Sequence, residues 1–105
     1  MAYPSKYTNA QVEILGVPVN PAKQLVAGSA SSNTVLTSTV SRISMRAVGA
    51  DIRFSIGVGT QTANGNTSNF IANGERLDFA VPVGANIAVI RDGTVNGTLE
   101  LTELI

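Results

Sequence analysis

Apolar and polar residues alternate along most of the chain after residue 40, with the period of two that turns one face of a β-strand toward a core. In residues 42–48, Ile43, Met45 and Ala47 fall on one face. No window of ten or more residues has the apolar spacing of an amphipathic helix. The pattern predicts eight short strands, at residues 23–27, 34–40, 42–48, 50–56, 70–72, 76–81, 86–91 and 98–102. A single open sheet would leave apolar faces uncovered, so we expect an all-β, antiparallel, jelly-roll-like β-sandwich.

Turn-forming residues between these stretches predict two hairpins. Asn73-Gly74 favours a type I′ turn, so we expect the strands on either side of it to pair. A second hairpin is expected around Gly49, in the register that places Arg46 opposite Asp51. We prefer that register because the alternative places two arginines opposite each other.

Two further stretches have a clear pattern. Residues 86–91 are apolar on both faces, which is typical of a central strand. Residues 57–68 are rich in Gly, Asn and Thr and have no apolar period, so we expect an exposed loop.

The chain divides into two parts by its pattern. We expect residues 1–22 to form an extended N-terminal arm that contacts a partner, and residues 23–105 to form the β-sandwich domain. Pro18 and Pro21 favour an extended segment or an edge strand within the arm. Residues 28–33 are small and polar, which favours a loop or a small-residue strand over the alternative of a flexible linker.

The composition excludes several classes of enzyme chemistry. The chain has no His and no Cys, so it offers no imidazole base, thiol nucleophile, disulfide or Cys/His zinc site. Glu75 with Asp78 and Glu100 with Glu103 are three residues apart, which places each pair on opposite faces of a strand. We therefore expect all four to be solvated charges, and we predict no enzyme activity, catalytic residue, metal site or cofactor.

The overall charge bears on the choice of partner. Seven basic and seven acidic residues cancel, so no net positive field attracts nucleic acid or an anionic membrane, and we expect neither as a partner. The first residues lack the apolar stretch of a secretory signal, which favours synthesis in the cytoplasm.

Arginines and tyrosines are the candidates for a contact with another protein. The arginines on polar strand faces either pair with acidic neighbours across the sheet or present one face to a partner, and both interpretations stay open. Tyrosines in a polar arm suit docking along a partner, and the alternatives are a frayed terminus or a strand added to the chain's own sheet. The predicted interface residues are Tyr3, Lys6, Tyr7, Arg42, Arg46 and Arg53. Phe54, Phe70 and Phe79 fall on apolar stripes and are expected in the core, which disfavours stacking on bases or sugars.

Residues 42–57 (RISMRAVGADIRFSIG) and 71–104 (IANGERLDFAVPVGANIAVIRDGTVNGTLELTEL) resemble small capsid-associated β-sandwich proteins of tailed bacteriophages, which are described as decoration, cement or head auxiliary proteins. The resemblance implies a non-enzymatic structural protein on the virion surface. It would bind the major capsid protein from outside and stabilise the shell, as a homo-oligomer such as a dimer or trimer. The second hypothesis is a carbohydrate-binding β-sandwich module associated with a phage tail or fibre.

Overall fold

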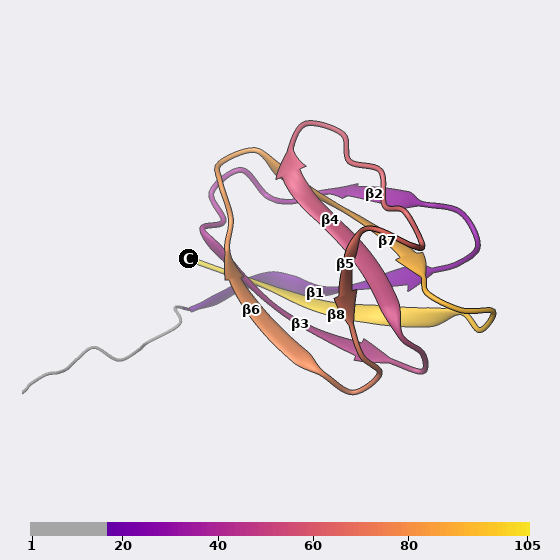
Figure 1. The fold of residues 1–105 in the computed structure, drawn as a ribbon. Coiled ribbons are helices and arrows are strands. Elements are labelled where there is room, and N and C mark those ends of the chain that lie inside the picture. The colour runs from indigo at the N-terminus through magenta and orange to yellow at the C-terminus, as the bar shows by residue number, and fades with distance from the viewer. Residues whose placement is uncertain (1–16) are drawn as a thin grey trace, which may run out of the picture.

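The structure is a computed structural model that describes residues 17–105, and these form eight β-strands (Figure 1). The strands are β1 (Pro18–Ala27), β2 (Ser32–Val35), β3 (Arg42–Val48), β4 (Ile52–Val58), β5 (Asn69–Ile71), β6 (Arg76–Ala80), β7 (Ala85–Arg91) and β8 (Gly97–Leu104). No helix with the length and apolar character of a membrane span occurs in this part of the chain. The expected all-β class and number of strands are confirmed, although the strand expected at 34–40 ends at Val35.

The strands form two antiparallel four-stranded sheets that pack face to face. Sheet A has the order β1-β8-β3-β6, and sheet B has the order β2-β7-β4-β5. β1 pairs with β8, β2 with β7, β3 with β6 and β4 with β5, which is the nested pairing of a jelly roll. β7 lies between β2 and β4, as its apolar pattern predicted. The antiparallel, jelly-roll-like sandwich is therefore confirmed.

Both predicted hairpins are wrong, because each turn carries the chain from one sheet to the other. β3 belongs to sheet A and β4 to sheet B, so the two strands do not pair. Arg46 instead lies opposite Glu100 of β8 on one side and Arg76 of β6 on the other. Likewise β5 belongs to sheet B and β6 to sheet A. The turn residues were recognised, but a turn does not specify the sheet that its second strand joins.

The Asn73-Gly74 turn is of type II and not of the predicted type I′. Only Gly74 of the pair has a positive φ, 86°, and a 2.8 Å backbone hydrogen bond closes the turn across residues 72–75. A type II turn splays its flanking strands, which suits a crossing between sheets. The Gly49 N–H donates to Asn73 Oδ1 at 3.0 Å, and the Asn73 N–H donates to Asp51 Oδ1 at 2.8 Å. The two crossing turns thus hold each other at one end of the sandwich.

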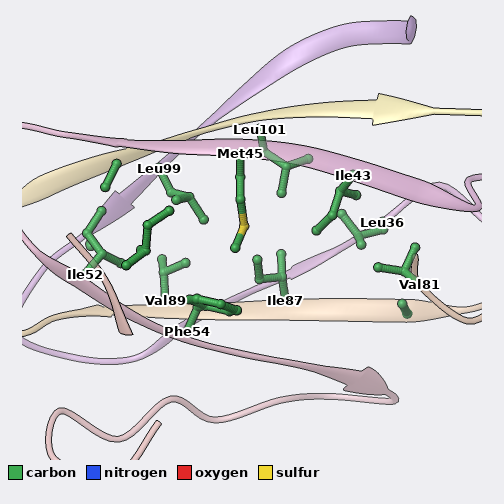
Figure 2. Close-up of a cluster of buried hydrophobic side chains, with 14 of the residues drawn as sticks. Leu36, Ile43, Met45, Ile52, Phe54, Val81, Ile87, Val89, Leu99 and Leu101 are labelled. Atoms are coloured by element: carbon green, nitrogen blue, oxygen red, sulfur yellow. The ribbon is translucent and has the colours of Figure 1, made fainter. Parts of the chain in front are cut away.

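Aliphatic side chains from both sheets fill the space between them (Figure 2). Ile43 and Met45 of β3 point toward Ile87 and Val89 of β7 in the close-up. The alternation therefore predicted the inward faces of β3 and β4 correctly. The core consists of Ala27, Leu36, Val40, Ile43, Met45, Ala47, Ile52, Phe54, Ile71, Val81, Ala85, Ile87, Val89, Leu99 and Leu101.

Strand β1 forms an edge of sheet A, as its prolines predicted, and begins at Pro18, so the last residues of the predicted arm lie in the sheet. Residues 28–33 form a loop and the start of β2 within the sandwich, not a linker. The Arg91 N–H donates to the Gly28 carbonyl at 3.0 Å, which ties this loop to β7.

A buried carboxylate holds the irregular part of β1. The register of β1 shifts between Val19 and Lys23, and Asn20 there has a φ of 64°. Asn20 Nδ2 donates to Glu103 Oε1 at 3.0 Å. The Thr37 N–H donates to Glu103 Oε2 at 2.8 Å, and Thr37 Oγ1 donates to Oε1 at 3.1 Å. Glu103 is 1% exposed, so the prediction that it is a solvated charge is wrong. The carboxylate accepts hydrogen bonds from two separate segments and joins them to β8.

The loop predicted at residues 57–68 occupies residues 59–68, because β4 extends to Val58, and it packs against sheet B. Ser55 Oγ of β4 donates to Gln61 Oε1 at 2.9 Å. The Ala63 N–H donates to Ser31 Oγ at 2.8 Å, and Ala63 is 4% exposed. The loop therefore covers part of the outer face of sheet B.

Candidate interaction surface

The structure separates the predicted interface residues. Arg42 and Arg46 lie on the outer face of sheet A, because the residues that alternate with them along β3 are buried. Arg53 lies on β4, in sheet B, and so does not share their face. Tyr3, Lys6 and Tyr7 fall outside the described residues. Among the three that the structure describes, Arg42 and Arg46 share one surface and Arg53 does not.

Arg53 is engaged by contacts within the sandwich. Its Nε donates to Asp92 Oδ1 at 2.8 Å in a salt bridge, and Nη1 donates to the Ser68 carbonyl at 3.0 Å. Its guanidinium carbon lies 4.9 Å from the centre of the Phe70 ring, a cation–π distance. Asp92 follows β7 and Ser68 precedes β5, so Arg53 joins two loops to β4.

A row of polar side chains crosses the outer face of sheet A. Gln24, Glu100, Arg46 and Arg76 lie opposite one another on β1, β8, β3 and β6. Gln24 Nε2 donates to Glu100 Oε1 at 3.0 Å, and Arg76 Nη1 donates to Ser44 Oγ at 3.0 Å. Arg46 and Arg76 are exposed. The sequence-based pairing of Arg46 missed Arg76, because β3 and β6 are separated by two other strands in the chain.

Exposed apolar side chains flank this row. Val26 of β1 is 62% exposed and Val48 of β3 is 41% exposed, and both lie opposite Thr98 of β8. Exposed arginines beside exposed valines form the combination of charged and apolar contacts that protein interfaces use. We define the sheet A outer surface as Gln24, Val26, Arg42, Arg46, Val48, Arg76 and Glu100.

An apolar groove opens between the edges of the two sheets. Leu77 and Phe79 of β6 pair with Met45 and Ile43, so they face sheet B, yet Phe79 is 37% exposed. β5 has only three residues and pairs with β4 only as far as Phe54, so the opposite sheet is short here. The groove has a volume of about 470 Å³. Its walls include Phe54, Ile56, Phe70, Leu77, Phe79 and Pro82.

Two of the three phenylalanines were therefore placed wrongly in the core. Phe54 is 2% exposed, as expected, and its ring centre lies 5.8 Å from that of Phe79. Phe70 is 42% exposed because β5 pairs it with Arg53 on the outer face of sheet B. Phe79 faces inward at an edge that the other sheet does not cover. Alternation in the sequence predicts a face, but it does not predict whether that face lies at an edge.

A second cavity, of about 320 Å³, lies where the two crossing turns meet. Asp51, Asn73 and Asp92 line it, and Asp51 and Asp92 accept the hydrogen bonds from Asn73 and Arg53 given above. No group of three or more His, Cys, Asp and Glu side chains that could hold a metal ion occurs among residues 17–105.

Comparison of the chain with protein-family models, with curated proteins and with solved structures found no match. The sequence and the structure together identify a small all-β, two-sheet sandwich.

Proposed function

We propose that this chain is a non-enzymatic structural protein of a tailed phage, which binds the major capsid protein from outside and stabilises the shell. The observation that carries the proposal is the sheet A outer surface, where Arg46 and Arg76 are exposed beside Val26 and Val48. The resemblance of residues 42–57 and 71–104 to capsid-associated proteins supports the choice of partner. A jelly roll also occurs in lectins, so the fold alone does not choose between the two functions.

The chemistry of this surface suits a folded, acidic protein partner. An arginine guanidinium can donate two parallel hydrogen bonds to a carboxylate, and such bonds fix orientation as well as adding affinity. Val26 and Val48 supply apolar area that becomes buried on contact.

Such binding would stabilise a shell by mass action. A protein that binds only the assembled lattice shifts the equilibrium toward that lattice. A shell has many equivalent sites, so even weak individual contacts add up over the particle.

Shells that lack the protein provide the direct test. Purified full-length protein is titrated onto DNA-filled shells, and co-sedimentation and the temperature of DNA release are measured. We expect binding that saturates at a fixed ratio to coat protein and a higher release temperature. Failure to co-sediment with shells would refute the proposal.

Two matched variants test the proposed surface. Arg46→Glu should weaken shell binding by roughly tenfold or more, because it reverses a charge in the middle of the contact. Arg91→Glu makes the same change on β7, where Arg91 Nη1 donates to Asn96 Oδ1 at 2.8 Å, and should bind nearly as the native protein does. Equal weakening by both variants would show that the sheet A outer surface is not the contact.

Carbohydrate binding is the second candidate, because Phe70 and Phe79 are exposed and aromatic rings can stack on sugars. Arg53 already lies over the Phe70 ring, which leaves Phe79 as the more accessible ring. Glycan-array binding that is lost in Phe79→Ala, together with no binding to shells, would favour this second function over the first.

A further inference from the structure

Three of the four sheet edges in the described structure carry features that discourage pairing with another chain. β1 contains Pro18, Pro21 and the bulge at Asn20. β2 has four residues, and the Gln61 N–H of the 59–68 loop donates to its Asn33 Oδ1 at 2.9 Å. β5 has only three residues. β6 is different: it has five residues in unbroken register with β3, and it contains no proline.

The backbone of β6 presents hydrogen-bonding groups along its outer edge. The Val81 N–H donates to the Ser41 carbonyl at 2.9 Å, and the Ala47 N–H donates to the Glu75 carbonyl at 3.2 Å. In an antiparallel ladder, alternate residues bond to the same neighbour. Odd-numbered residues of β6 therefore bond toward β3. The N–H and C=O groups at positions 76, 78 and 80 point away from sheet A.

The inner side of the same strand is apolar and incompletely covered. Leu77 is half-buried and Phe79 is 37% exposed at the groove between the sheets. An apolar groove beside an unprotected strand edge is a surface that another strand can cover, through backbone pairing and side-chain burial at once.

The charges on β6 match a second copy of the same strand. Arg76 and Asp78 are two residues apart on the outer side, and both are exposed. When two β6 strands pair antiparallel about a two-fold axis through Leu77, Arg76 of each copy lies opposite Asp78 of the other. This register creates two opposite-charge pairs and brings together the outward-pointing backbone groups of residues 76 and 78. Sliding one strand by two residues along the other, to the neighbouring register, would instead place the two Asp78 side chains opposite each other.

We propose that two copies of this chain associate through antiparallel pairing of their β6 strands in this register. Sheet A then continues into sheet A of the second copy as one eight-stranded sheet. The Leu77 side chains of the two copies meet at the axis, and the two apolar grooves adjoin. The dimer does not depend on the proposed capsid function, because it requires only the chain itself.

Engineered disulfides test the register, because the chain contains no cysteine. Leu77→Cys places a single thiol on the axis, in a non-hydrogen-bonded pair whose two Cβ atoms lie close enough to bridge after small adjustments. Asp78→Cys is the matched control, one residue from the axis. Under mild oxidation we expect a disulfide-linked dimer from Leu77→Cys and little from Asp78→Cys. Preferential cross-linking of Asp78→Cys would overturn the register.

Charge exchange tests the association without a covalent bond. Sedimentation velocity should show the native protein as a dimer at submillimolar concentration. Asp78→Arg should weaken the dimer by roughly tenfold, because two favourable pairs become two repulsive ones. Combining Asp78→Arg with Arg76→Asp should restore it. A monomeric native protein would overturn the proposal. So would a double variant that does not regain the dimer, provided that circular dichroism shows both variants to be folded.

Hydrogen exchange distinguishes the other possible occupants of this edge. The amides of residues 76 and 78 should become protected as the protein concentration rises, since a second copy covers them. Protection that is independent of concentration in a protein that sediments as a monomer would mean that a segment of the same chain covers β6. Protection that appears only on shells would assign the edge to the coat protein. Either of these two results would overturn self-association while leaving the capsid proposal open.

Discussion

Replacing Glu103 by alanine tests whether a buried carboxylate holds the edge of sheet A. The carboxylate accepts three hydrogen bonds, from Asn20 Nδ2, the Thr37 N–H and Thr37 Oγ1, at 2.8 to 3.1 Å. A hydrogen bond contributes about 0.5–1.5 kcal/mol net, and more when one partner is charged. Asn20 and Thr37 are exposed residues, so water can reach their donors once the carboxylate is gone. We therefore expect a loss of about 2–4 kcal/mol in the free energy of unfolding.

Thermal unfolding followed by far-UV circular dichroism measures this loss, since the chain has no Trp to report by fluorescence. A domain of this size loses about 4–8 °C in Tm for each kcal/mol, so Glu103→Ala should unfold at least about 8 °C below the native protein. Glu103→Gln keeps one acceptor oxygen, so its Tm should lie between those of Glu103→Ala and the native protein.

Glu100→Ala provides the matched control on the same strand. Glu100 faces outward and accepts one hydrogen bond from the exposed Gln24, so its removal should cost less than about 1 kcal/mol. A free energy of unfolding for Glu103→Ala within about 0.5 kcal/mol of the native value would show that the carboxylate does not hold this edge. A Glu103→Leu variant as stable as the native protein would show the same, because apolar packing alone would then hold the edge.

Two further changes test the turns and loops. Gly74→Ala should lower the free energy of unfolding by about 1 kcal/mol because of the positive φ alone, since no heavy atom lies within 4 Å of the added Cβ. Gly93→Ala is equally open and has no positive φ, so it should leave Tm unchanged. Equal effects of the two changes would show that the positive φ is not the cause. Arg53→Lys keeps the charge but cannot hold Asp92 and the Ser68 carbonyl together. It should lower the free energy of unfolding by about 1 kcal/mol and speed proteolysis of residues 59–68. An unchanged cleavage rate would show that Arg53 does not anchor the loop.

The position of the apolar side chains was predictable because it depends on local alternation. Ile43 and Met45 are buried as their spacing indicated, and β7 is central because it is apolar on both faces. For the proposed surface, the sequence placed Arg42 and Arg46 on one polar face. It did not add Arg76 to them, because that neighbour comes from a strand far along the chain.

The sequence by itself determined an all-β chain, the approximate limits of most strands and the inward faces of β3 and β4. Those properties follow from propensity and period, which act over a few residues. Only the tertiary structure decided which strands pair, because pairing depends on how all eight strands bury their faces together. It therefore also decided the burial of Glu103, the exposure of Phe70 and Phe79, and the place of β6 at an open edge. β6 contains no proline that marks it as an edge strand, so its place, like the other features, is decided only when the two sheets meet.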